Sequence, residues 1–234
     1  MQPLGLETAN GPDRRLVVVG LSGLLAGCLG GRTYRYRIGA EVSVAGRVIR
    51  GDAVREVYDR PGIRGTSGMD TGTTLSRGDA AMVDLGPRGI LFLTLQGWAQ
   101  GTPPAERYMS TETWTPLAPL ARELGPDDWW RQDGQRVRLL DGEIPVMVTF
   151  GDLNDPRTVR VVNPEELAAT FGPGVSLISV YVELTRRSVT RGIHRKLPWL
   201  TGGVTALSRK YGSSGDKMAD RLYPWAFSSR NGNG

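Results

Sequence analysis

Apolar and polar residues alternate along much of this 234-residue chain, and that period of two is typical of β-strands with one buried face. The longest alternating run is formed by Tyr34, Tyr36, Ile38, Ala40, Val42 and Val44. Ala45-Gly46 then predicts a turn into a second strand that ends near Tyr58. The region therefore predicts a long leading hairpin.

Shorter apolar runs predict five further strands, at 80–85, 90–96, 146–150, 158–162 and 178–184. Residues 86–89 join the first two of them as a turn, and Asp141-Gly142 predicts a two-residue hairpin between 137–140 and 144–146. The glycine-rich stretch 59–79 has no period and predicts a loop.

Two short helices complete the expected elements. The first lies within 113–124, where Pro116 and Pro119 confine regular helix to the later part. The second spans 164–171, with Asn163 as its cap and Gly172 at its end. Strands in hairpin order with two short helices predict a mainly β fold, an antiparallel sandwich, open barrel or half-barrel.

The N-terminal region has a different pattern. Arg14 and Arg15 precede eleven largely apolar residues, 16–26, and small residues follow up to Cys28. As a helix this run would span about 16 Å, roughly half of a ~30 Å hydrocarbon core, so it is too short for a stable membrane span. A buried helix with a core cysteine is the alternative, but its several glycines disfavour it. The order of basic, apolar and small residues is typical of an export signal.

The sequence Leu25-Ala26-Gly27-Cys28 resembles the lipobox of bacterial lipoproteins. The resemblance implies a signal peptide at 1–27, cleavage between Gly27 and Cys28, and a diacylglycerol on the sulfur of Cys28. Several acyl chains would anchor the protein stably, because one chain alone gives marginal binding.

The same resemblance implies an address. Leu29 is not the aspartate that is associated with inner-membrane retention, so we expect an outer-membrane protein facing the periplasm. Lipid would occupy the only cysteine, and the mature chain of Cys28–Gly234 would contain no disulfide.

Four runs in the C-terminal half look like an uncharacterised group of proteobacterial envelope proteins: 148–159, 171–175, 189–193 and 197–200. That resemblance implies an envelope protein and carries no activity. Together the patterns predict a β-rich domain at 28–185 and a basic, aromatic tail at 186–234.

The tail carries most of the positive charge. It holds ten lysine and arginine residues against Asp216 and Asp220, whereas 28–185 has a net charge of −3. Such a mixture of cations and aromatic rings suits an anionic membrane surface or an envelope partner. Nucleic acid attracts the same charge, but an exported chain rarely meets it, so none is expected. The candidate surface comprises Arg186, Arg187, Arg191, Arg195, Lys196, Trp199, Arg209 and Lys210.

The alternative for this tail is structural. It would wrap the domain with apolar anchors buried and with solvated arginines between them. The candidate anchors are Leu197, Trp199, Leu200, Tyr223 and Trp225.

Residues for catalysis are few. Asp70-Thr71-Gly72 resembles the Asp-Thr-Gly triplet of aspartic proteases, which need two carboxylates, but only one triplet exists and a glycine-threonine loop is the preferred interpretation. Asp152, Asn154 and Asp155 suggest calcium ligands less than Asx turns. His194 is the only histidine and lies among cations.

We therefore expect no metal or cofactor, and a lipid-anchored envelope protein with a non-catalytic binding or scaffolding role. The alternatives are a periplasmic hydrolase that uses Asp70 and an accessory subunit of an envelope assembly.

Overall fold

The structure is a computed structural model, and it describes residues 32–60, 72–98, 109–125, 133–200, 207, 212–217 and 219–229. The chain divides into two units, Met1–Gly30 and Gly31–Gly234. All of the described residues belong to the second unit, so the fold below is that of Gly31–Gly234.

A long hairpin forms the centre of the first sheet. Strand β1 (Arg32–Val44) pairs with β2 (Arg47–Arg60) over its whole length, as the alternation predicts. Ala45 and Gly46 both have positive φ, 49° and 80°, which is the geometry of a tight two-residue hairpin turn.

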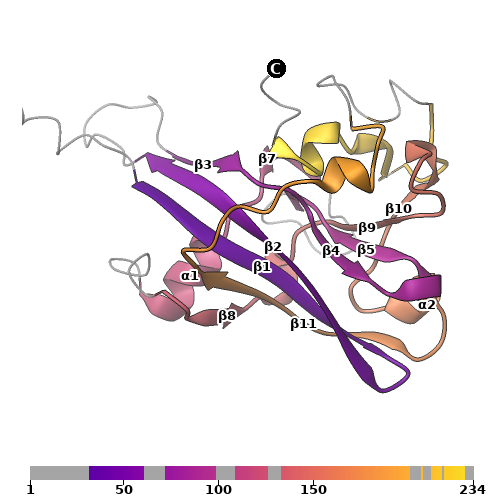
Figure 1. The fold of residues 1–234 in the computed structure, drawn as a ribbon, viewed down its shortest axis with the longest axis horizontal. Coiled ribbons are helices and arrows are strands. Elements are labelled where there is room, and N and C mark those ends of the chain that lie inside the picture. Colours follow the sequence, from indigo (N-terminus) through magenta and orange to yellow (C-terminus); the bar gives the residue numbers. More distant parts are fainter. Residues whose placement is uncertain are drawn as a thin grey trace, which may run out of the picture. The chain divides into compact units, whose positions relative to one another are not determined.

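Strand β3, which follows β2 in the chain, and two strands from more distant parts extend this hairpin to five strands in the order β3-β2-β1-β11-β8. Strand β11 (Val175–Leu184) lies antiparallel to β1, with Ile38 opposite Val182. The edges are β3 (Gly72–Arg77) and β8 (Arg136–Arg138). Figure 1 shows β1, β2 and β11 running side by side.

The second sheet has four shorter antiparallel strands in the order β10-β9-β5-β4. They are β4 (Ala81–Asp84), β5 (Ile90–Leu93), β9 (Met147–Phe150) and β10 (Val159–Val161). A separate ribbon pairs β6 (Gln96–Trp98) with β7 (Met109–Thr113).

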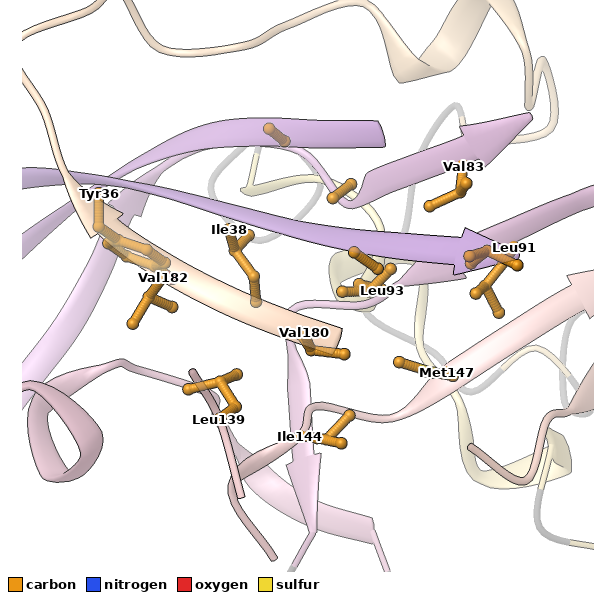
Figure 2. Packing of buried hydrophobic residues seen from close by; sticks show 14 of the residues in the cluster. Tyr36, Ile38, Val83, Leu91, Leu93, Leu139, Ile144, Met147, Val180 and Val182 are labelled. Carbon is orange, nitrogen blue, oxygen red and sulfur yellow. The ribbon is translucent and has the colours of Figure 1, made fainter. Parts of the chain in front are cut away.

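The main hydrophobic core lies between the two sheets. Tyr36 and Ile38 of β1, Val182 of β11, and Leu91 and Leu93 of β5 belong to one cluster, and Figure 2 shows Tyr36 beside Val182 at one end of it and Leu91 at the other. All five are buried. The fold is therefore mainly β and antiparallel, as predicted, with the two sheets packed as layers of a sandwich.

A second core covers the other face of the four-stranded sheet. Ile90 and Phe92 of β5 point away from the first core, and so does Phe150 of β9. They pack against the C-terminal segment, 186–229, through these buried residues: Ile193, Leu197, Trp199, Leu200, Leu207, Ala219, Leu222, Ala226 and Phe227. The four-stranded sheet is thus a middle layer, buried on both faces.

The C-terminal segment is fixed to the sheet by backbone hydrogen bonds as well. The amide of Ala80 donates to the Phe227 carbonyl over 2.8 Å, and that of Leu95 donates to Ala226 over 2.7 Å. The residues after the expected boundary at 185/186 therefore do not form an independent tail. They belong to the same compact unit as the strands and wrap around the sheet with buried anchors.

Helices are short in the described residues. Helix α1 spans Leu117–Leu124, the later part of the predicted helix, and α2 spans Leu167–Phe171. None of the helices in the described ranges is long and apolar enough to cross a bilayer. Single turns of 3-10 helix lie at Gly86–Arg88, Asp141–Glu143, Pro156–Thr158, Ile193–Arg195, Ala219–Arg221 and Pro224–Ala226.

Two local predictions are wrong. The hairpin expected at Asp141-Gly142 is absent, because 139–146 connects the two sheets and buries Leu139 and Ile144 in the main core (Figure 2). The expected loop at 59–79 contains the end of β2 and the whole of β3. In addition, α2 starts at Leu167 rather than at 164, although Asn163 does accept from the Glu165 amide through Oδ1.

Candidate functional site

The basic residues of the C-terminal segment begin on a strap that crosses β1. Directly after β11, the Thr185 amide donates to the Arg35 carbonyl in β1. Five residues later, the Thr190 amide donates to the Val54 carbonyl in β2, and Thr190 Oγ1 accepts from the Val54 amide. The core fills the inner face of β1, so 186–189 pass over its outer face.

Arg186, Arg187, Arg191, Arg195 and Lys196 are all exposed, as a surface role requires. They do not form one cluster. Arg186 and Arg187 lie beside the first residues of β1, whereas the other three follow Thr190 and flank Ile193, whose amide donates to Asp79 Oδ2.

Trp199 does not belong to the exposed surface that the sequence predicted. Its side chain is 8 % exposed and packs in the second core, with ring centroids 5.6 Å from Phe150 and 5.5 Å from Phe227. Its indole nitrogen donates to the Leu153 carbonyl over 3.0 Å. The aromatic ring is thus an internal anchor, as the alternative predicted. Arg209 and Lys210 lie outside the described residues.

A pocket of about 480 Å³ lies next to the start of β1. Its wall includes Thr33, Tyr34 and Arg35 of β1, Glu56 of β2, and Leu184 and Arg186 at the end of β11. Arg35 Nε lies 2.8 Å from Glu56 Oε2, and Arg186 Nε lies 3.3 Å from Asp133 Oδ2. The pocket is polar and carries charges of both signs.

The outer face of the five-stranded sheet carries a ladder of ion pairs. Arg37 bonds to Glu183, Arg50 bonds to Glu41, and Arg136 lies 3.7 Å from Glu41 and 3.5 Å from Glu183. The Arg50 hydrogen bond is the main reason that the pKa of Glu41 is lowered from its ordinary value. The ladder therefore fixes a charged array on this face.

Tyr181 lies within the same array. Its ring rests over Gly39, where a Cβ atom would come within 2.6 Å of the tyrosine hydroxyl. The Arg136 guanidinium covers the ring at 4.0 Å from its centroid. Burial raises the pKa of Tyr181, so the hydroxyl stays neutral at ordinary pH.

Arg55 is the polar residue that the sequence pattern did not single out. It is fully buried, and it donates to the carbonyl oxygens of Asp79, Leu93 and Thr94 over 3.2, 2.8 and 3.1 Å. Within the described ranges no carboxylate forms an ion pair with it. The alternation did carry a signal, since Ala53, Arg55 and Val57 share the inward face of β2.

The remaining candidates form no catalytic cluster within the part of the chain that the structure describes. Asp70 lies in 61–71, outside the described residues. The Asx turns are confirmed, because Asp152 Oδ1 accepts from the Asn154 amide and Asp155 Oδ1 from the Arg157 amide. His194 is exposed in a 3-10 turn. Across the described ranges, no group of three or more His, Cys, Asp or Glu side chains is placed to hold a metal ion.

Comparisons with protein-family models, with curated proteins and with solved structures find no match for this chain. We therefore infer function from the residues and the geometry described above.

Proposed function

We propose that this chain is a lipid-anchored envelope lipoprotein with a non-catalytic binding or scaffolding role, held at the periplasmic face of the outer membrane through Cys28. The observation that supports it best is the position of the unit boundary. The compact unit begins at Gly31, only three residues after Cys28, so cleavage before Cys28 would leave that unit whole.

The resemblance of Leu25-Ala26-Gly27-Cys28 to a lipobox and the boundary at Gly30/Gly31 are independent observations. One comes from local sequence, and the other comes from how the rest of the chain folds. Their agreement favours a signal peptide followed directly by a folded domain.

A binding or scaffolding role is supported by the outer face of the five-stranded sheet. In the ladder from Arg37 through Glu183 and Arg136 to Glu41 and Arg50, the side chains of Arg136 and Arg50 are well exposed, at 47 % and 63 %, whereas the other three are 15–17 % exposed. A fixed charge array of this kind favours recognition of a partner with complementary charge.

Metabolic labelling with an alkyne fatty acid tests the anchor. We expect the wild-type protein to incorporate the label and Cys28→Ala to lose it, because the sulfur is the attachment point. A Leu29→Ala variant is the matched control and keeps the label. Equal labelling of wild type and Cys28→Ala would refute the proposal.

Membrane separation tests the address in the same strains. The wild-type protein is expected in the outer-membrane fraction, and Leu29→Asp is expected to move to the inner membrane. A wild-type protein found in the inner membrane would contradict the outer-membrane part and leave the lipid anchor standing.

A further inference from the structure

The length of the tether limits which surface can face the membrane, and this inference rests on the proposed anchor at Cys28. Four residue steps separate Cys28 from Arg32, where β1 begins. At ~3.3–3.6 Å per residue they span at most about 14 Å. The side chains around the start of β1 are therefore held close to the lipid headgroups.

The fold brings four arginines to that place. Arg32 and Arg35 belong to the first residues of β1, Arg32 on the side of the sheet that carries Tyr34 and Arg35 on the opposite side. The hydrogen bond from the Thr185 amide to the Arg35 carbonyl places Arg186 and Arg187 beside them, although more than 150 residues separate the two pairs in sequence. Arg35 and Arg186 line the same pocket. We call these four residues the basic rim.

The rim is accessible to an anionic ligand. Arg32 and Arg187 are exposed, and the side chains of Arg35 and Arg186 are 39 % and 90 % exposed. The ion pair between Arg186 and Asp133 lies at the surface, where such pairs are weak and are readily exchanged for phosphate oxygens, whereas the Glu56 carboxylate is buried and stays paired with Arg35 Nε.

We propose that the basic rim lies against anionic phospholipid headgroups of the membrane that holds the Cys28 lipid. The rim then orients the domain. Val44, the last residue before the β1–β2 turn, lies twelve residue steps along β1 from Arg32, about 40 Å at ~3.3 Å per residue, so the turn points away from the bilayer. The acyl chains hold the protein at the surface, and the arginines fix which end faces it.

The second basic group, Arg191, Arg195 and Lys196, is not part of this contact. The chain reaches it only after Thr190 has paired with Val54 in β2, at the far side of β1 from Thr185. The expected basic surface thus divides into a membrane-facing pair, Arg186 and Arg187, and a group free to face the periplasm.

Fluorescence quenching on the full-length lipidated protein tests the orientation. Lipid occupies the only natural cysteine, so a thiol-reactive fluorophore labels Ser188→Cys beside the rim or Val48→Cys beside the distant turn. Both positions are exposed. The vesicles contain phosphatidylcholine with or without phosphatidylglycerol, and a headgroup-linked nitroxide is the quencher.

We expect quenching at 188 to exceed that at 48 by at least about twofold on vesicles with phosphatidylglycerol, and to decrease without it or at high salt. The double variant Arg186→Glu/Arg187→Glu should lose the difference. Arg195→Glu/Lys196→Glu makes the same change of charge in the other basic group and should keep it.

Equal quenching at 188 and 48, or a difference that survives reversal of Arg186 and Arg187, would overturn the rim proposal. The intact mass of the same samples separates this failure from failure of the anchor. A mass that includes acyl chains on Cys28 leaves the lipoprotein proposal standing, whereas a mass without them contradicts both proposals.

Discussion

At the scale of single residues, Arg55 is the most consequential side chain of the interior. Its guanidinium joins β2 to the carbonyls of Asp79 before β4 and of Leu93 and Thr94 at the end of β5. Asp79 in turn accepts from Ser228 and from the Ile193 amide. One buried cation therefore links both sheets to the C-terminal segment.

Replacing Arg55 tests this role. Arg55→Met keeps most of the volume but leaves three buried carbonyls without this donor, so we expect the free energy of unfolding to fall by about 3 kcal/mol or more in urea denaturation. The control Arg50→Met removes an exposed pair with Glu41 and should cost at most about 1 kcal/mol. Similar losses for the two variants would contradict the account.

Gly51 lies where the backbones of the two sheets come very close together. A Cβ atom at this position would lie 1.8 Å from the carbonyl oxygen of Met82 in β4, so only glycine lets the two backbones come this close. The sequence shows a glycine inside a strand, which signals a close approach, but only the fold identifies the partner.

The Gly51→Ala variant is expected to lose about 3 kcal/mol or more, because backbone must move to relieve the overlap. A Cβ at Gly142 meets nothing within 4 Å, so Gly142→Ala should change stability by less than about 0.5 kcal/mol. Thermal unfolding followed by circular dichroism compares the two. An unchanged midpoint for Gly51→Ala would show that the sheets do not cross there.

At the scale of elements, the sequence predicted the pairings that join strands close together along the chain. The β1–β2 hairpin, the β4–β5 turn and the pairing of Phe150 with Val159 all join neighbours in sequence, and all were predictable. The insertion of β11 beside β1 joins residues about 140 apart, and no local pattern specifies that choice.

The hairpin predicted at Asp141-Gly142 was wrong for a similar reason, because contacts distant in sequence decide the local structure. This dipeptide is a hairpin signal, but contacts made elsewhere in the chain decide its conformation. Glu143 pairs with Arg122 of α1, and its carbonyl accepts from the Trp114 indole. These contacts and the burial of Leu139 and Ile144 hold the segment as a connection between sheets.

The C-terminal segment stabilises the four-stranded sheet. Deleting it would therefore destabilise the domain as well as remove a surface. Phe227 is fully buried against Phe92, Phe150 and Trp199. We expect Phe227→Ala to cost about 3–5 kcal/mol, and the exposed control Arg191→Ala to cost less than about 0.5 kcal/mol, in urea denaturation.

An accessory subunit of an envelope assembly would contact its partner through 186–234, and deletion of these residues is not a clean test of that contact. Removing those residues would uncover the outer face of β5 and β9, so loss of a partner in such a deletion would report unfolding. Charge reversal at Arg195 and Lys196 tests that contact without disturbing the core. A Phe227→Ala protein as stable as wild type would contradict this picture of the segment.

At the scale of the whole molecule, the sequence predicted the mainly β class and left the layers open. The uninterrupted apolar runs Ile90–Leu93 and Val146–Val148 do signal strands buried on both faces. What covers their second face became clear only from the fold, because the described parts of the C-terminal segment are mostly short 3-10 turns and irregular chain, which show no hydrophobic period to detect.

The unit boundary at Gly30/Gly31 connects this architecture to the proposed function, since the proposed anchor at Cys28, the start of β1 and the first two arginines of the basic rim, Arg32 and Arg35, follow each other within a few residues. Intact mass spectrometry of the protein extracted from native membranes tests that central claim most directly. We predict a mass equal to residues 28–234 plus a diacylglycerol and any further acyl chain on Cys28. A mass equal to the unprocessed 234-residue chain, with a free thiol, would contradict the account.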